Sequence, residues 1–249
     1  MNFKECNLSE NLLLIIILAW VLLTPMIDLT RAVPLTLWSL ISVVDSYFYA
    51  QICFKRTTLW GDWSMAMPIK YLLGNKIYLR SLEQTDVEFM HQFVNNDVEA
   101  RRLTGTQNCF TLAQIEAYIG SQGHDDSRVV FGIVRHEDDQ MVGEVVLNDI
   151  DRNNRSANFR IAISDPFTGQ GYGTEATRLM LDYGFGMLNL HRIELDVYTI
   201  NERAAHVYEK VGFKREGVKR QNWYFNHQYY DSIVMSVLEN EFRAMKTTK

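Results

Sequence analysis

The sequence of 249 residues predicts an α+β domain built on a mixed sheet, preceded by an apolar N-terminal segment. Three observations predict this class. Short segments of alternating apolar and polar side chains recur from residue 76 onward, helix-start patterns stand between several of them, and polar turns join some of them into hairpins. We therefore expect a folded domain at 67–249 and an extension at 1–66.

The first elements of the domain are a strand and two capped helices. Residues 76–82 alternate in polarity, which predicts the strand. Thr85 followed by Glu88 has the capping-box spacing and predicts a helix that runs to residue 95. The pattern returns at Thr111 and Gln114, before a second helix that ends near residue 120. The apolar face of the first helix would consist of Val87, Met90 and Phe93.

Strands and helices then alternate to the C-terminus. The polar turn at 137–140 joins two strands, and Asn226-His227 joins two more, so both pairs are expected to form hairpins. In chain order we expect strands at 129–136, 141–150 and 156–163, a helix at 171–185, a strand at 192–198, a helix at 201–211, and strands at 217–223 and 229–237.

Composition excludes several classes of function. The formal net charge is −5, so no basic excess is available to neutralise a nucleic-acid backbone, and we expect no nucleic-acid partner. The six histidines are scattered without metal-ligand spacing. The three cysteines are too far apart in sequence for a disulfide framework or a metal knuckle, and they indicate a reducing compartment: Cys6, Cys53 and Cys109.

Two interpretations fit the N-terminal segment. Residues 11–27 are apolar and uncharged, close to the minimum length of about 17 residues for a bilayer span. Residues 33–54 form a weaker apolar run followed by Lys55 and Arg56, so a membrane hairpin through 11–54 would keep both ends in the cytoplasm. Alternatively, Met65 or Met67 is the true start and the upstream residues are spurious translation. In either case we expect the domain to be cytoplasmic, with or without a membrane tether.

A glycine-rich segment between a strand and a helix is the strongest chemical motif. Gly169, Gly171 and Gly173 allow a ligand to approach the backbone, and the free N–H groups at a helix start near Thr174 favour an anion such as a pyrophosphate. The spacing does not match GxGxxG, and no Lys-Ser/Thr pair follows, which excludes the Rossmann and Walker A motifs. A plain tight connection would also explain such a segment.

The segment resembles the acyl-CoA signature Q/R-x-x-G-x-G/A of the GNAT N-acetyltransferase family, with Gly171 and Gly173 in the glycine positions. It departs from the signature at Thr168, where the family usually has Gln or Arg. That departure removes one side-chain contact and leaves the cradle of amides. By this resemblance the cofactor-binding residues are Thr168, Gly169, Gln170, Gly171, Tyr172, Gly173 and Thr174.

A second motif resembles the same family. Residues 201–213 match its pattern N-x-x-A-x-x-x-Y-x-x-x-G-F, and the two motifs together are far more specific than either alone. The resemblance implies a GNAT fold, with a mostly antiparallel twisted sheet that splays where acetyl-CoA binds. It is closest to the branch that contains ribosomal-protein and spermidine N-acetyltransferases. The matching positions are Asn201, Ala204, Tyr208, Gly212 and Phe213.

Acetyl transfer needs a deprotonated amine, a donor for the oxyanion and a proton for the leaving thiolate. By resemblance, Tyr208 is the acid beside the sulfur, and the residue-level alternative is an aromatic core residue. Glu144, on a central strand, is the candidate general base, with a solvated strand residue or deprotonation through water as alternatives. Asn201 resembles the family's cofactor-contacting Asn and is also a natural helix cap. The backbone of Ile161, Ala162 and Ile163 would accompany the pantetheine arm.

We therefore expect an N-acetyltransferase that uses acetyl-CoA as co-substrate and no metal, with a non-catalytic acyl-CoA-binding module as the alternative. The acceptor would be a peptide N-terminus, a polyamine or another small amine, and a homo-oligomer is compatible with the sequence. A polyamine enzyme should carry an acidic cluster in its early helices. The acidic residues there are sparse and Arg101 and Arg102 lie among them: Asp86, Glu88, Asp97, Glu99 and Glu116. The two arginines would suit an acceptor that bears a carboxylate or phosphate, and an ordinary solvated face is the alternative.

Overall fold

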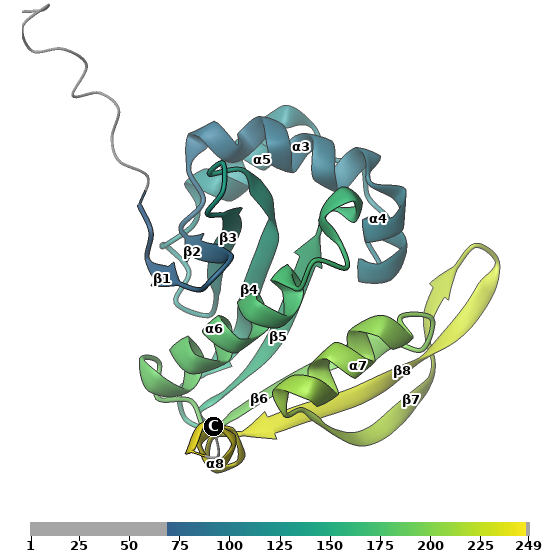
Figure 1. Ribbon diagram of the computed structural model, residues 1–249. Coiled ribbons are helices and arrows are strands. Elements are labelled where there is room, and N and C mark those ends of the chain that lie inside the picture. Colours follow the sequence, from purple (N-terminus) through teal and green to yellow (C-terminus); the bar gives the residue numbers. More distant parts are fainter. Residues whose placement is uncertain (1–68, 248–249) are drawn as a thin grey trace, which may run out of the picture. The chain divides into compact units, whose positions relative to one another are not determined.

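The computed structural model describes residues 69–247, which form one sheet with helices on both faces (Figure 1). The strands are β1 (Leu72–Leu73), β2 (Ile77–Arg80), β3 (Val129–Arg135), β4 (Met141–Asp151), β5 (Ser156–Ile163), β6 (Arg192–Tyr198), β7 (Lys214–Phe225) and β8 (Gln228–Leu238), in the spatial order β1-β2-β3-β4-β5-β6-β8-β7. The helices are η2 (Gln84–Asp86), α3 (Val87–Asn96), α4 (Val98–Thr104), α5 (Leu112–Gly120), η3 (Asp165–Phe167), α6 (Tyr172–Gly186), α7 (Glu202–Val211) and α8 (Glu239–Thr247).

The sheet opens between β5 and β6. Every other neighbouring pair is antiparallel, whereas β5 and β6 are parallel and pair only from Ser156–Arg192 to Asn158–Glu194. Beyond Asn158 the two strands diverge, as Figure 1 shows, so the outer edge of residues 159–163 has no strand partner. The predicted mixed, mostly antiparallel sheet with a splay is therefore confirmed.

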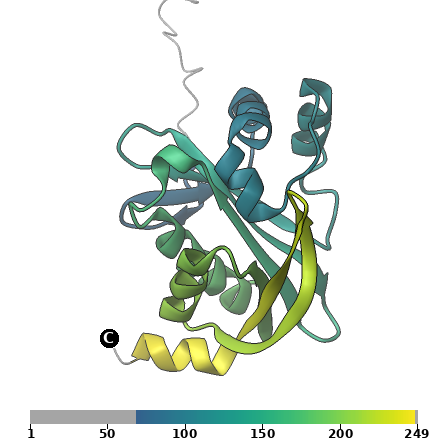
Figure 2. The same ribbon diagram turned by 90° about the vertical axis from the view of Figure 1, so that its right-hand side faces the viewer.

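Each face of the sheet carries its own core, because successive side chains of a strand point to opposite faces. On one face, Phe131, Val145, Leu147 and Phe159 pack with α6 and α7 in the larger cluster. On the other face, Tyr78, Val130, Val134 and Val146 pack with α3 and α5. Helix α8, the yellow helix at the bottom of Figure 2, contributes Phe242 to the larger core.

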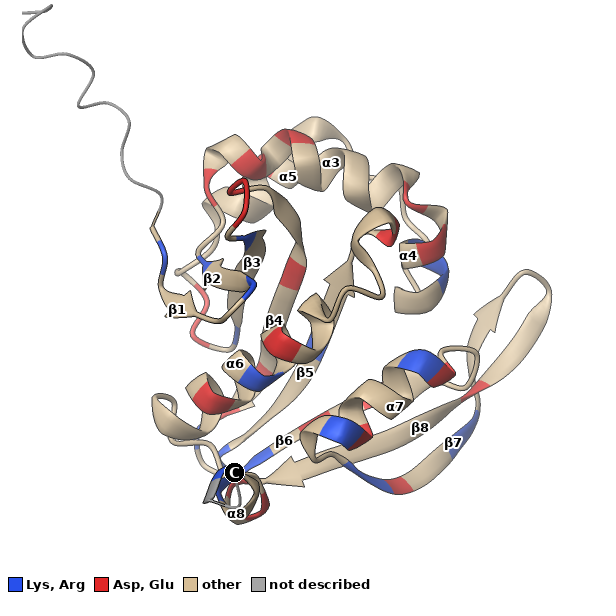
Figure 3. Cartoon of the chain, viewed as in Figure 1, with Lys and Arg blue, Asp and Glu red and all other residues tan. Residues whose placement is uncertain are grey.

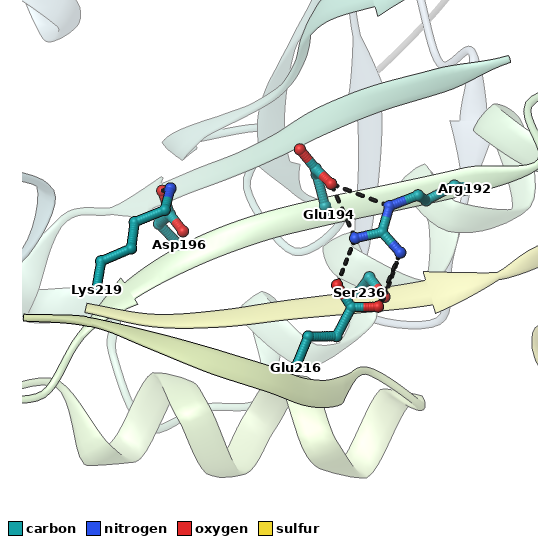
Figure 4. A network of polar contacts seen from close by, with 6 residues as sticks. All are labelled: Arg192, Glu194, Asp196, Glu216, Lys219 and Ser236. Carbon is teal, nitrogen blue, oxygen red and sulfur yellow. Dashed lines mark hydrogen bonds and ion pairs between the residues drawn. The ribbon is translucent and has the colours of Figure 1, made fainter. Parts of the chain in front are cut away.

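A polar network holds the closed end of the splay (Figure 4). Arg192, at the start of β6, donates to Glu194 on its own strand and to Glu216 on β7, at 3.0 and 2.8 Å. Ser236 on β8 donates to Glu216 at 2.6 Å, so the network spans three strands. Because Arg192–Glu194 is also the segment of β6 that pairs with β5, these contacts stabilise the point from which the strands diverge.

Three sequence predictions about the helices need correction. The first capping box is made by Glu83 and Asp86 at the start of η2, two residues before the predicted pair. Helix α6 begins at Tyr172 with Gly171 as its N-cap, which agrees with the predicted range 171–185 but lies two residues before the start near Thr174 that the glycine-rich segment indicated. Helices α4 and α8 were not predicted, because each is short and lies outside the periodic segments.

The remaining predicted elements are present. Thr111 and Gln114 form the second capping box, and the apolar side chains Val87, Met90 and Phe93 are buried. Asn226 and His227 adopt positive φ angles of 46 and 64° in the turn of the β7–β8 hairpin, which suits the twist of the two strands.

The membrane hairpin predicted for residues 11–54 lies outside the described residues. None of the helices between residues 69 and 247 has the length and apolar character that a bilayer span requires. In the same part of the chain, no three His, Cys, Asp or Glu side chains are grouped so that they could hold a metal ion.

Candidate active site at the splayed strands

The glycine-rich loop leads from η3 into the N-terminus of α6. Gly169 and Gly171 have positive φ angles of 77 and 91°, a region that favours glycine. No atom lies within 4 Å of the place that a Cβ would occupy at either residue. Gly171 caps α6 without a side-chain hydrogen bond, so the first N–H groups of α6 are free to meet an anion. The loop therefore offers an open anion cradle suited to the diphosphate of an acyl-CoA.

Contacts with the β1–β2 turn hold this cradle in place. Glu175, in the first turn of α6, accepts a hydrogen bond from the backbone N–H of Lys76 at 3.1 Å and another from that of Asn75. The Lys76 ammonium donates to the backbone carbonyl of Gln170 at 3.1 Å. Lys76 thus brings a positive charge to the loop, which adds to the attraction for a phosphate.

The open edge of β5 presents backbone groups to the splay. Ser164 N donates to Val142 O at 2.9 Å, so the alternation along an antiparallel strand turns the backbone groups of Ala162 toward β4 as well. The backbone groups of Ile161 and Ile163 consequently point to the open edge. These two residues are placed to pair with the amides of a pantetheine arm, whereas Ala162 contributes its side chain to the opposite face.

The side chains of two further candidate cofactor-binding residues form hydrogen bonds with nearby backbone groups. The Thr168 hydroxyl donates to the carbonyl of Asp165 at 3.0 Å, which ends η3. The Asn201 side-chain oxygen accepts from Ala204 N at 3.1 Å and so caps α7, as the sequence predicted. Tyr172 is buried, Gln170 is exposed, and Gly173 and Thr174 lie half-buried in the first turn of α6.

Tyr208 lies on α7 at the point where β5 leaves β6. Its ring packs edge-on against Phe159, the first residue of β5 beyond the paired segment, with the ring centroids 6.0 Å apart. Among residues 69–247 its hydroxyl has no protein hydrogen-bond partner. Burial raises the pKa of the Tyr208 phenol above its ordinary value of 10.0, so the group is protonated at neutral pH, as an acid must be.

Glu144 lies on the opposite face of the sheet. It is paired with Ala162 across the β4–β5 ladder and is half-buried. The Tyr118 hydroxyl approaches its carboxylate at 3.4 Å. Burial raises the pKa of Glu144 above its ordinary value, and the positive charges of Arg160 and Arg128 and the Tyr118 hydrogen bond oppose that shift. A carboxylate with a raised pKa is a suitable proton acceptor near neutral pH.

Glu144 forms part of the lining of a pocket of about 430 Å³ between the sheet and helices α3, α4 and α5. The open strand also borders it, through Ile161 and Ala162. Its apolar wall includes Met90, Phe93, Phe110 and Ile115. This volume lies within the range typical of small-molecule sites. The pocket and the face that holds Tyr208 therefore meet at the splay.

Sequence reasoning missed Arg128 and Arg160 among the basic side chains of this pocket. Arg128 precedes β3, and Arg160 lies on β5 beside Glu144, yet neither belongs to a motif. The sequence did point to Arg101, with Arg102, as compatible with an acceptor that bears a carboxylate or phosphate, or with an ordinary solvated face. Figure 3 shows charges of both signs on α4. In the structure Ala162 lies opposite Glu144 on the neighbouring strand. Arg160 is two residues before Ala162 on β5, so its side chain lies on the same face of the sheet as Glu144.

The acidic residues expected for polyamine recognition are largely engaged elsewhere. Asp86 is buried and accepts two hydrogen bonds from Arg80, at 2.6 and 2.8 Å. Asp97 caps α4 and accepts from Ser164 Oγ and Asp165 N at 3.0 and 2.8 Å. Glu99 pairs with Arg102. Neither Glu88 nor Glu116 lines the pocket.

Comparison with known proteins identifies the family. The acetyltransferase (GNAT) domain family matches residues 76–214. The spermidine N(1)-acetyltransferase of Escherichia coli K12 is 33% identical over 175 residues, covering 70% of this chain and 92% of that protein. The putative ribosomal N-acetyltransferase YdaF of Bacillus subtilis is 32% identical over 109 residues, covering 44% and 60%.

A comparison with solved structures supports the same family. The crystal structure of spermidine N-acetyltransferase from Vibrio cholerae in complex with CoA and spermine matches with a TM-score of 0.64 and 29% identity, covering 68% of this chain and 99% of that one. The family match, the splayed sheet and the open glycine-rich loop all support the same family assignment. The chain belongs to the GNAT acetyltransferase family and is an acetyl-CoA-dependent N-acetyltransferase.

Proposed function

We propose that the chain acetylates a primary amine bound in the pocket above Glu144, by direct attack of the amine on the thioester. The observation that carries this proposal is the position of the two candidate catalytic groups. Tyr208 and Glu144 lie on opposite faces of the sheet, and the splay between β5 and β6 is the passage that joins the faces. The cofactor and the acceptor can then approach the splay from opposite sides.

Each residue has a separate role in this proposal. Acetyl-CoA supplies the activated acetyl group. Glu144 removes a proton from the ammonium form of the acceptor, directly or through water, because an alkyl ammonium with a pKa near ~10 has no free lone pair. The backbone of Ile161 and Ile163 aligns the pantetheine arm, and Gly169–Gly173 with the N-terminus of α6 hold the diphosphate. Tyr208 donates its proton to the departing thiolate.

The acceptor class is a peptide N-terminus or a small amine. The alternative of a non-catalytic acyl-CoA-binding module has no support among the relatives reported above, which are all named as acetyltransferases. Release of free thiol from acetyl-CoA, followed for the full-length protein with a panel of amines and N-terminal peptides, tests the proposal. We expect amine-dependent release, and release that no amine accelerates would contradict it.

We also propose that residues 67–249 are the catalytic unit and that residues 1–66 are a separate extension. The apolar runs at 11–27 and 33–54 support a membrane tether. Carbonate extraction of cells that express the full-length chain tests the tether. Retention in the membrane fraction is expected, and release into the supernatant would contradict it.

A further inference from the structure

The acceptor pocket contains buried polar atoms that the protein leaves unpaired. Arg101, Arg128 and Asn148 line it, and each carries a buried side-chain atom without a hydrogen-bond partner in the protein: Arg101 Nε, Arg128 Nε and Asn148 Oδ1. They are three of the five such side-chain atoms found among residues 69–247. Buried polar groups without partners are unfavourable and uncommon in folded proteins. The polar side chains around this pocket are therefore only partly satisfied by the protein itself.

The charge of the pocket is positive. Its charged lining residues are Arg101, Arg128, Arg160 and Glu144, which gives three positive charges and one negative. None of these arginines forms an ion pair with a carboxylate in the part of the chain that the structure describes. Arg101 bonds a backbone carbonyl, and Arg128 lies 5.4 Å from the Tyr118 ring. Glu144 is the one carboxylate among the lining residues of this pocket, so the three guanidinium charges exceed what it can neutralise and leave positive charge for a ligand.

The register of β4 and β5 orders these groups along the pocket floor. Glu144 lies opposite Ala162, and Val146 lies opposite Arg160. The step from residue 144 to residue 146 is roughly 7 Å along the strand. A ligand whose amine meets Glu144 would thus have its other end beside Arg160 after a short stem. The apolar wall of Met90, Phe93 and Ile115 suits a hydrocarbon stem.

These observations separate two kinds of acceptor. A polyamine carries a positive charge at each end, and unpaired arginines would repel the distal ammonium. A carboxylate would instead pair with a guanidinium, in the geometry for which arginine is best suited. We infer that the acceptor of this enzyme is a small primary amine that also carries a carboxylate, with the amine at Glu144 and the carboxylate at Arg128 and Arg160. The inference rests on the proposed function.

Three acceptors that differ only at the distal end provide the test: 5-aminopentanoate, pentylamine and cadaverine. Their distal groups are negative, neutral and positive, and their reacting amines are alike. With full-length protein and saturating acetyl-CoA, kcat/KM should fall in that order. We expect roughly tenfold or more between the first and the last, as for gain or loss of a charged contact. The same order is expected for the rise in melting temperature that each compound causes in the CoA-bound protein.

A matched pair of arginine variants sharpens the test. Arg160→Gln should reduce the ratio of kcat/KM for 5-aminopentanoate to that for cadaverine by about tenfold, because a charged contact is lost. Arg152→Gln, which removes an exposed arginine outside the pocket, should leave the ratio unchanged. Melting temperatures verify that both variants are folded.

The outcomes distinguish the inference from the proposed function. Preference for cadaverine in rate and in thermal stabilisation would overturn the carboxylate inference and leave the N-acetyltransferase activity intact. An Arg160→Gln ratio equal to that of the unaltered protein would also overturn it. A protein that binds acetyl-CoA but acetylates none of the three compounds, and no other amine or peptide, would contradict the proposed function itself.

Discussion

The two faces of the sheet at the splay are built in different ways. On the face that carries α6 and α7, here called the cofactor face, the groups proposed to bind acetyl-CoA are backbone groups of a loop, a helix start and a strand edge, with Tyr208 held among aromatic rings. On the acceptor face they come from charged side chains on α4, β4, β5 and the segment before β3. A backbone cradle depends on a few glycines and tolerates change at its other positions, whereas a side-chain pocket alters with each substitution. Cofactor use can therefore persist across a family while the acceptor changes.

The largest effect is expected from the acid on the cofactor face. Tyr208→Phe removes the proposed proton donor for the thiolate and keeps the ring that packs on Phe159. We expect kcat to fall by roughly 10²- to 10³-fold, within the range for general acid–base groups, while the Kd of acetyl-CoA stays the same. Thiol release and calorimetric titration measure the two quantities. Tyr183→Phe, on α6 and away from the splay, is the matched control.

Because burial raises the pKa of the Tyr208 phenol, the acid stays protonated well into the alkaline range. The rate of the unaltered protein should consequently show no loss through deprotonation of this group below pH ~10, the usual value for a tyrosine. If Tyr208→Phe has the same rate as the unaltered protein, Tyr208 is not the acid.

A smaller effect is expected on the acceptor face. Glu144→Gln should lower kcat/KM by about tenfold to a hundredfold, less than the loss at Tyr208, because water provides a second route for the proton. The pKa of Glu144 lies above its ordinary value, so activity of the unaltered protein rises as the pH increases through that pKa and the carboxylate forms. The variant should lose this limb of the pH–rate profile.

Glu116→Gln, on the exposed side of α5, provides the comparison for Glu144→Gln. A Glu144→Gln profile that keeps the same limb as the unaltered protein would show that another group accepts the proton.

Two glycines with similar positive φ angles allow backbone strain to be distinguished from cofactor binding. Gly171 has a φ of 91° and Gly123 a φ of 85°, and both have open space beside them. Alanine at either position should reduce stability by about 1 to 2 kcal/mol, because of the left-handed backbone. Only Gly171→Ala should also weaken acetyl-CoA binding, by roughly tenfold, since its methyl group occupies the cradle. Equal acetyl-CoA affinity of the two variants would place the diphosphate elsewhere.

The smallest effect is expected at the closed end of the splay. The Arg192 guanidinium and the Ser236 hydroxyl lower the pKa of Glu216 to about 2, below the unfolded value of about 4.3. A folded pKa below the unfolded one contributes stability above pH ~4.3, and that contribution is lost as the pH falls toward about 2. The groups are partly exposed, so the contribution should be about 1 kcal/mol or less.

Glu216→Gln should accordingly lower the melting temperature at pH 7, and the difference from the unaltered protein should shrink as the pH falls from 4.5 toward 2.5, a window of about two units below the unfolded pKa. A difference that is constant across this range would show that the ion pair contributes nothing measurable.

The sequence allowed most of the fold, the family and the use of acetyl-CoA to be predicted. Alternation located the long strands, and the spacing of Gly171, Gly173, Asn201 and Tyr208 indicated the family, because backbone cradles and caps need particular residues at fixed separations. The acceptor pocket could not be predicted in this way. Arg128 and Arg160 come together only through the β3–β4–β5 register, and Arg101 is positioned by a short helix whose Asp97 cap also bonds the end of β5.

Amide hydrogen exchange of the full-length protein, with and without saturating CoA, tests the central claim most directly. If the pantetheine arm lies along the open edge of β5 and the diphosphate lies at α6, then CoA should slow exchange at Ile161, Ile163 and the amides of residues 169–173. Exchange of Ala162, whose amide faces β4, should change little. Unchanged exchange at the open edge and the loop, under conditions where CoA is bound, would contradict the account.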